Sequence, residues 1–321
     1  MGVRLCRFSV DGEARWGVVT GERVQPLRAQ YETLQQVLIE GVADVRRAAE
    51  SAGTWSLQEI RLLSPITRPA RLVCQGANYA NHRSEAGMAP ERPLFNLIFS
   101  KSDTALSGPE DDIIRPEGVR LLDYEVELGL VIGRPLTEPT RVTQERLGEF
   151  VAGAVICNDV SARDVQLLEG QWFKGKSYRT FCPTGPYIYL FDPGEAAIVH
   201  DLHLQLWVNG DLRQSAHTSQ LLYGPEETLT ELSGMMDLAP GDVLLTGTPG
   251  GVALNLTAEE LGLLSDPRVP ADEKRRLLET SQVGHTRYLQ DGDVVTCEIR
   301  SSDGRVHLGT QRNRVRFHHV D

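Results

Sequence analysis

The chain has 321 residues, of which 40% are hydrophobic and 24% charged, and its formal net charge is −11. This length is sufficient for one large domain and one small domain with ample core. The negative charge argues against nucleic acid and anionic membranes as partners.

No apolar run long enough to span a membrane occurs, and the first residues lack the apolar core of a secretory signal. The five cysteines follow no regular spacing, which is typical of buried, reduced thiols in a reducing compartment. We therefore expect a cytoplasmic protein with no membrane partner.

Residues 1–65 contain short alternating runs, a helical pattern from Thr33 to Ser51, and the strand-like run IRLLSPI. These patterns predict a small, strand-rich N-terminal domain with one or two helices. No candidate chemistry lies in this region. Residues 66–321 are expected to form the second domain, which carries the candidate site.

His82 and Glu85 follow the short apolar strand RLVCQG. On a helical turn, a spacing of three puts both side chains on one face within hydrogen-bond reach. A carboxylate beside an imidazole stabilises its protonated form and makes it a better general base for water. A surface ion pair would explain the same spacing. The following AGMAPERP segment suggests a lid loop, and Lys101 then ends an apolar strand.

The stretch LLDYEVELGLVIG, Leu121 to Gly133, has apolar residues mostly on alternate positions and is predicted to be a strand with one face in a core. The opposite parity carries Asp123, Glu125 and Glu127, so three carboxylates would project from one face. Such close carboxylates repel each other and have raised pKa values unless a cation neutralises them. A solvent-facing strand edge is the alternative interpretation.

A second strand favours the metal interpretation. The run FVAGAVICND is almost wholly apolar and delivers Asp159 at its tip. Glu125, Glu127 and Asp159 would together offer three oxygen ligands without Cys or His. This set suits Mg²⁺ or Mn²⁺ and disfavours structural zinc.

Residues 161–170 are predicted to form a helix or turn that carries Arg163 and Gln166. The next residues, GQWFKGKS, match the GxxxxGK[ST] phosphate-loop pattern. Such a loop needs a helix directly after it, and the following YRTFCPTGPY cannot start one. Nucleotide binding is therefore disfavoured.

Further along, NGD at 209–211 predicts a hairpin, Glu226 to Met236 a helix, and VLLTGTP a strand that ends in a polar loop. The amides and hydroxyls of this loop, including that of Thr248, suit an anion, although a simple turn is the alternative. Between residues 256 and 285, TAEE has capping-box spacing, and two short helices are expected. The C-terminal His318 and His319 are expected to be frayed.

Several of these motifs occur together in a known family. DYEVEL, NDVSARDVQ, GKSYRTFCPTGP, the NG pair and PGDVLLTGTPGGV, in this order between about Leu72 and Arg314, resemble the fumarylacetoacetate hydrolase superfamily. The resemblance implies a strand-rich α+β fold, a mixed β-sheet roll of the C-terminal type of that family, with a small N-terminal domain. It also implies a homodimer. In most relatives the 256–285 insertion is a short loop, so the insertion would line the substrate entrance or widen a dimer contact, and it leaves the substrate open.

The resemblance also implies roles for matched residues. His82 and Glu85 would be the dyad that activates water, and Lys176 would face the substrate carboxylate or a developing enolate. Further substrate contacts would come from Arg163, Gln166, Lys101 and Thr248.

The implied activity is divalent-metal-dependent hydrolysis of a C–C bond in a 2,4-dioxo acid of the acylpyruvate or fumarylpyruvate type. Water activated by His82 would attack C4, and the metal and Lys176 would stabilise the pyruvate enolate that leaves. An isomerase or decarboxylase of a 2-oxo or 2-hydroxydienoic diacid in aromatic catabolism would use the same enolate. A metal-dependent protein that binds a 2-oxo acid without turnover is the remaining alternative.

Overall fold

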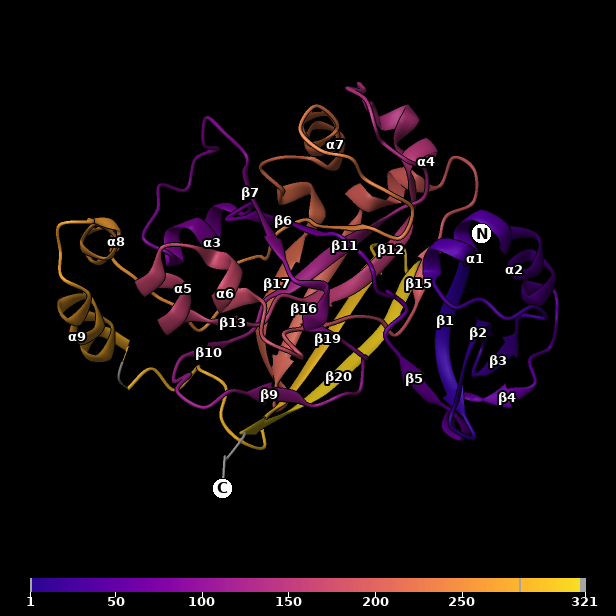
Figure 1. Cartoon of the computed structure of the whole chain (residues 1–321), viewed down its shortest axis with the longest axis horizontal. Helices are drawn as coiled ribbons and strands as arrows, with labels where there is room; N and C mark the ends of the chain where they lie inside the picture. The colour runs from indigo at the N-terminus through magenta and orange to yellow at the C-terminus, as the bar shows by residue number, and fades with distance from the viewer. Residues whose placement is uncertain (1, 283, 318–321) are drawn as a thin grey trace.

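The computed structural model describes residues 2–282 and 284–317, so His318 and His319 lie outside it. One large mixed sheet runs from the N-terminal strands into the centre of the molecule (Figure 1). In spatial order its strands are β4 (Trp55–Ser56), β3 (Arg23–Pro26), β2 (Glu13–Thr20), β1 (Val3–Val10), β15 (Ile188–Leu190), β12 (Val151–Asn158), β11 (Val126–Ile132), β18 (Val243–Leu245), β6 (Leu72–Gly76) and β7 (Leu97–Lys101), with β5 (Arg61–Leu63) paired to β1.

A second sheet has the order β17 (Asp211–His217), β16 (Leu202–Val208), β19 (Val294–Ser301), β20 (His307–Phe317) and β9 (Ile113–Arg115). Strand β16 alternates between buried and half-buried residues, as expected for a strand with one face in a core. Its hairpin with β17 confirms the predicted turn, where Asn209 and Gly210 have φ of 54° and 88°. Two short ladders join β10 (Leu122–Asp123) to β13 (Ser161–Ala162) and β8 (Leu106–Ser107) to β14 (Cys182–Pro183).

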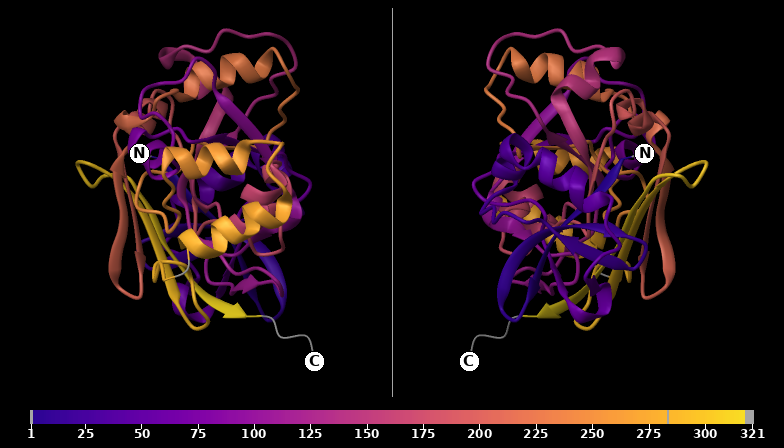
Figure 2. Two further views of the ribbon diagram at one scale, coloured as in Figure 1. Left: turned by 90° about the vertical axis from the view of Figure 1, so that its left-hand side faces the viewer. Right: turned by 90° about the vertical axis from the view of Figure 1, so that its right-hand side faces the viewer.

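The helices lie around these sheets (Figures 1 and 2). They are α1 (Leu34–Glu40), α2 (Val42–Ala49), α3 (Ala80–Glu85), α4 (Leu147–Phe150), α5 (Arg163–Glu169), α6 (Trp172–Lys176), α7 (Pro225–Ser233), α8 (Ala258–Ser265) and α9 (Ala271–Gln282). In the parts of the chain that the structure describes, none is long and apolar enough to cross a membrane.

The helical pattern predicted from Thr33 to Ser51 forms two helices that meet at Gly41. The Gly41 amide closes α1 by donating to the Val37 carbonyl at 2.9 Å. Thr33 is the N-cap of α1 and forms a capping box with Gln36. The Thr33 side chain accepts a hydrogen bond from the Gln36 amide, and the Gln36 side chain accepts one from the Thr33 amide. Both helices lie beside the N-terminal strands, coloured indigo in Figure 1.

The strand predicted from Leu121 to Gly133 is broken into β10 and β11. At the break, the Glu125 carbonyl accepts a hydrogen bond from the Asp159 amide at 2.8 Å, and the Glu125 amide donates to the Asn158 side chain at 2.9 Å. Strand β11 is buried along its whole length. It lies between β12 and β18 within its sheet and also contacts β16 of the second sheet. The prediction of one strand with a single buried face is therefore wrong.

The insertion forms α8 and α9, which confirms the two predicted helices, and Thr257 begins α8 with the predicted capping box. Both helices pack against α5, at the end of the molecule opposite the N-terminal strands (Figures 1 and 2). Their apolar side chains join a small separate core of buried residues: Val252, Leu254, Leu256, Leu264 and Leu278. The five cysteines are all buried and free, as predicted.

Candidate metal centre and its cavity

Three carboxylates converge at one end of the β11–β12 pair. The two strands are antiparallel with Val126 opposite Asn158, so Glu125 and Glu127 at the start of β11 meet Asp159 at the end of β12. Each of the three residues offers an oxygen within 4.8 Å of the others, and all three are buried. The structure thus brings together the residues predicted as metal ligands.

Three cationic side chains surround these carboxylates. Lys176, at the end of α6, donates to Glu125 at 2.7 Å and to Asp159 at 2.6 Å. Lys101 contacts the other oxygen of Asp159. Arg163, at the start of α5, pairs with Glu125 at 2.5 Å and with Asp123 at 2.8 Å.

Asp123 lies apart from the cluster, which corrects the prediction of three carboxylates on one face. Its carboxylate accepts hydrogen bonds from the Ala253 and Leu254 amides at 2.8 and 3.1 Å in addition to that from Arg163. The break before β11 turns Asp123 away from its neighbours. Asp123 therefore holds Arg163 in place.

Glu127 is a buried carboxylate that forms no ion pair with a lysine or arginine in the described ranges. Its side chain accepts one hydrogen bond, from the Gly247 amide at 2.9 Å. Burial, reinforced by the negative charges of Asp159 and Glu125, raises the pKa of Glu127 well above its ordinary value. In contrast, although burial opposes it, Lys176 and Arg163 hold the pKa of Glu125 well below its usual range.

The charges of this region do not cancel. When all are ionised, the four buried carboxylates Asp123, Glu125, Glu127 and Asp159 face three cations, Lys101, Arg163 and Lys176, so the balance is 3 − 4 = −1. A divalent cation would change it to +1, which the carboxylate of an acidic ligand would then neutralise. Three carboxylate oxygens are ligands that Mg²⁺ and Mn²⁺ prefer. The residues present therefore fit such an ion.

His82 lies on α3, is 7% exposed, and lines the same cavity. Its Nδ1 atom is buried and has no hydrogen-bond partner in the described part of the chain. Burial lowers the pKa of His82 to about 4, and the effects of Arg163 and Lys176 add to this while that of Glu125 opposes it. The imidazole is thus neutral at pH 7 and able to accept a proton.

Glu85 lies on the same helix but is hydrogen-bonded elsewhere. Both of its carboxylate oxygens accept the Gly251 amide, at 2.8 and 2.9 Å, whereas His82 Nδ1 is unpartnered. Gly251 has φ of +105°, and a Cβ there would lie 1.9 Å from the Arg213 carbonyl, so only glycine presents this amide. The structure places the predicted dyad on one helix without a hydrogen bond from His82 Nδ1 to Glu85.

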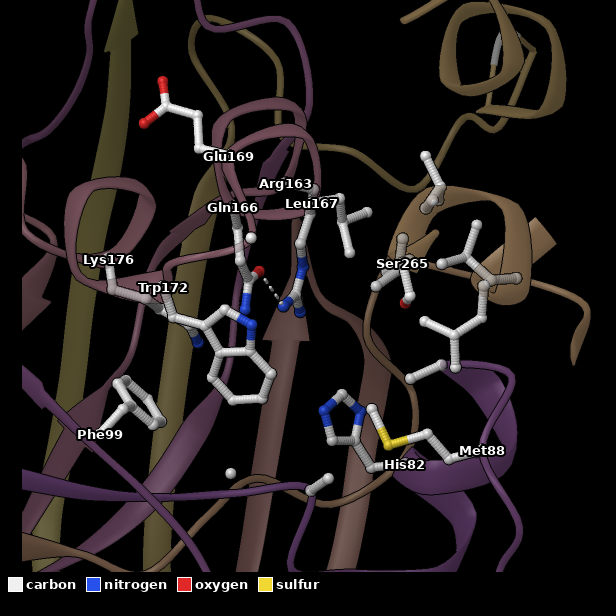
Figure 3. A pocket seen from close by; sticks show the side chains of 18 of the residues that line it. His82, Met88, Phe99, Arg163, Gln166, Leu167, Glu169, Trp172, Lys176 and Ser265 are labelled. Carbon is white, nitrogen blue, oxygen red and sulfur yellow. Dashed lines mark hydrogen bonds between the residues drawn. The ribbon is translucent and has the colours of Figure 1, made fainter. Parts of the chain in front are cut away.

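Three of the four predicted substrate contacts line the cavity: Arg163, Gln166 and Thr248. Gln166 accepts a hydrogen bond from Arg163 at 3.0 Å (Figure 3), and Thr248 is held by Gln214 and the Val126 carbonyl. Lys101 is not among the described residues that line the cavity. It donates to Asp159 and to the Phe181 carbonyl at 2.8 Å, so it holds a carboxylate of the cluster in place.

The cavity has a volume of about 470 Å³ and three kinds of wall. Its polar floor holds Glu125, Glu127, Lys176 and His82. One side carries Phe99 and Trp172, whose ring centroids are 5.1 Å apart at an interplanar angle of 73°. Figure 3 shows Met88 and Ser265 on the opposite side. The aliphatic lining of the cavity comprises Ala86, Met88, Leu167, Leu168, Leu254, Leu256, Leu261 and Leu264.

Sequence reasoning missed this aromatic side. Trp172 lies inside the segment that matches the phosphate-loop pattern, and helix α6 forms within that segment rather than after it. Its lysine, Lys176, pairs with Glu125 and Asp159. The structure therefore has no phosphate loop at this position, in agreement with the sequence context.

A cluster of carboxylates suited to a divalent ion lies at the floor of a cavity in a strand-rich α+β fold, an arrangement found in enzymes that act on small molecules. The model of the family "Fumarylacetoacetate (FAA) hydrolase C-terminal" matches residues 71–316, and that of "Rv2993c-like, N-terminal" matches residues 3–65. The chain belongs to the fumarylacetoacetate hydrolase family.

Three similar proteins illustrate the family. Protein Rv2993c of Mycobacterium tuberculosis is 39% identical over 67% of this chain and 81% of its own length. The mitochondrial oxaloacetate tautomerase FAHD2B of Bos taurus is 37% identical over 88% of this chain and 80% of its own. The structure of a fumarylacetoacetate hydrolase from Exiguobacterium antarcticum matches with a TM-score of 0.74 and 33% identity, covering 98% of this chain and 100% of that one.

Proposed function

We propose that this protein is a divalent-metal-dependent hydrolase that cleaves the C3–C4 bond of a 2,4-dioxo acid of the acylpyruvate or fumarylpyruvate type. The observation that carries the proposal is the shared cavity. Glu125 and Glu127 of the carboxylate cluster line it, together with Lys176 and a neutral, buried His82. A homodimer and a cytoplasmic location stay predictions.

Each group has a role in this reaction. Glu125, Glu127 and Asp159 would hold Mg²⁺ or Mn²⁺, which supplies Lewis acidity toward the 2-oxo and carboxylate oxygens. His82 takes a proton from water, and the hydroxide adds to the C4 carbonyl. Collapse of this adduct breaks the C3–C4 bond and releases a carboxylic acid and the pyruvate enolate. Lys176 stabilises the enolate charge until C3 takes up a proton.

Keto–enol isomerisation of a 2-oxo acid is the second candidate. It needs one base at C3 and no activated water, so a His82 without Glu85 is sufficient. The hydrogen bonds of Glu85 to the Gly251 amide favour it, as does the similarity to oxaloacetate tautomerases. Decarboxylation of a 2-oxo diacid would pass through the same enolate.

A Glu85→Gln variant separates these reactions. If Glu85 orients His82 toward water, the variant loses pyruvate release from acylpyruvates by about 10²-fold while keto–enol exchange of oxaloacetate is unchanged. Pyruvate release, enol absorbance and CO₂ release are measured with Mg²⁺, Mn²⁺ or EDTA, and EDTA is expected to abolish every activity. Glu91→Gln, which makes the same change at an exposed loop residue, is the matched control.

The alternatives give different results. Full pyruvate release by Glu85→Gln would exclude a part for Glu85 in water activation. Isomerisation or CO₂ release without cleavage of any acylpyruvate would replace the hydrolase proposal by the second candidate or by decarboxylation. Tight binding of 2-oxo acids without turnover would identify a non-catalytic binding protein.

A further inference from the structure

We propose that the helical insertion is the specificity element of this protein, and that it selects a substrate whose tail beyond the 2-oxo acid head is an uncharged, apolar chain. The inference rests on the proposed function for the head group. It adds the chemical class of the tail.

The lining of the cavity supports an apolar tail. The insertion contributes Leu256, Leu261 and Leu264, and α5 contributes Leu167 and Leu168. Leu256 and Leu264 are each 3% exposed. Together with Phe99 and Trp172, these side chains line a space in which every buried methylene of a ligand is stabilised.

The start of the insertion is hydrogen-bonded to the helix that carries His82. The Leu256 amide donates to the Glu85 carbonyl at 2.8 Å. At its far end, Gln282 donates to the Asn255 carbonyl at 2.9 Å and accepts from the Tyr288 hydroxyl at 2.8 Å. Gly87, just after α3, lies so close to the insertion that a Cβ there would be 2.6 Å from the Thr257 carbonyl. The start of the insertion, which would bind the tail, and the helix that carries His82 are therefore packed together in this structure.

The charges away from the polar floor do not favour an acidic tail. The charged residues among the described lining outside the floor are Arg163, Glu169 and Lys274. Glu169 is exposed and pairs with Lys174 at 2.6 Å. A second carboxylate on the ligand would lie among leucines, where an unpaired charge is costly. Of the described lining cations outside the floor, Arg163 is already paired with two carboxylates, which leaves the half-exposed Lys274 to face it.

The test uses ligands that bind but cannot be cleaved. Straight-chain 2-oxo acids from 2-oxobutanoate to 2-oxodecanoate lack the C4 carbonyl, so their binding to the Mn²⁺-loaded protein, measured by calorimetry, is independent of hydrolysis. We expect the dissociation constant to fall about threefold to fourfold with each added methylene. Leu261→Asp, which puts a charge into the wall, is expected to remove this dependence. Leu263→Asp lies on the same helix, is 40% exposed and does not line the cavity, so it should behave like the natural protein.

Each outcome decides a different point. A flat series in the natural protein overturns the apolar-tail inference, and so does tighter binding of a 2-oxo diacid than of the monoacid of equal length. If the dissociation constant for Leu261→Asp still falls with chain length, the insertion does not determine specificity. If no 2-oxo acid binds, including 2-oxobutanoate, the proposed function fails together with the inference.

Discussion

Replacing Glu127 with glutamine is expected to raise the melting temperature of the metal-free protein and to abolish its stabilisation by Mg²⁺ or Mn²⁺. Glu127 is the buried carboxylate of the cluster without an ion pair in the described residues, and an uncompensated buried charge destabilises the fold. A gain of about 1 kcal/mol corresponds to roughly 2–4 °C. A ligand at 100 times its Kd adds about 2.7 kcal/mol, which the variant would lose.

The pH dependence of this effect follows from the direction of the shift. The folded state raises the pKa of Glu127 above its ordinary value of 4.5, so the folded protein binds the proton more tightly than the unfolded chain does. The contribution of this group to stability is therefore fully present below pH 4.5 and is lost as pH rises through the raised pKa. Glu127→Gln should remove this decline.

Melting curves between pH 4 and 9, with and without metal, test the effect of Glu127→Gln on the melting temperature and on its pH dependence. Calorimetry in buffers of different ionisation enthalpy should also detect a proton released when the metal binds, at every pH below the raised pKa. Glu117→Gln, at an exposed position, is the control. An unchanged metal-induced rise in melting temperature in Glu127→Gln would show that the ion does not bind to this cluster.

Replacing His82 with glutamine is expected to lower kcat by about 10²- to 10⁴-fold, the usual contribution of a general base, while metal affinity is retained. The pKa of His82 is lowered to about 4, and a divalent ion nearby would lower it further. The natural enzyme should therefore stay active well below pH 6.5, losing activity only as His82 becomes protonated.

The profile of kcat/KM against pH and metal titration of the variant check this prediction. His203→Gln, on the half-exposed side of β16, is the control. If kcat/KM of the natural protein falls near pH 6.5, or if His82→Gln is fully active, another group transfers the proton.

The carboxylate cluster could be predicted from the sequence because each of its residues lies within or at the end of a recognisable strand pattern. Glu125 and Glu127 are two residues apart at the start of one strand, and Asp159 directly follows a strand that is almost wholly apolar. The break before β11 could not be predicted, since Leu122 and Val126 keep the same parity on both sides of it. The direction of the Asp123 side chain depends on that break.

Other parts of the site depend on contacts between distant segments. The spacing of His82 and Glu85 is the same whether Glu85 faces the imidazole or the Gly251 amide, which is 166 residues away. The position of Lys101 beside Asp159 depends on how β7 pairs with β6. The two helices of the insertion were predicted from capping and periodicity, but their contribution to the cavity follows from their packing against α5.

Strand β1 pairs with β15 through Val3 to Leu5 and Ile188 to Leu190, so the N-terminal strands join the central strands through segments as far apart in the chain as Val3 and Leu190. At about 5–20 residues per second, ribosomes need roughly 10–40 s to synthesise the intervening chain. During that time, β1 can pair with β2 and β5 while its remaining edge is open to other chains. Nascent molecules on one messenger would therefore be most prone to mispairing before residue 190 emerges.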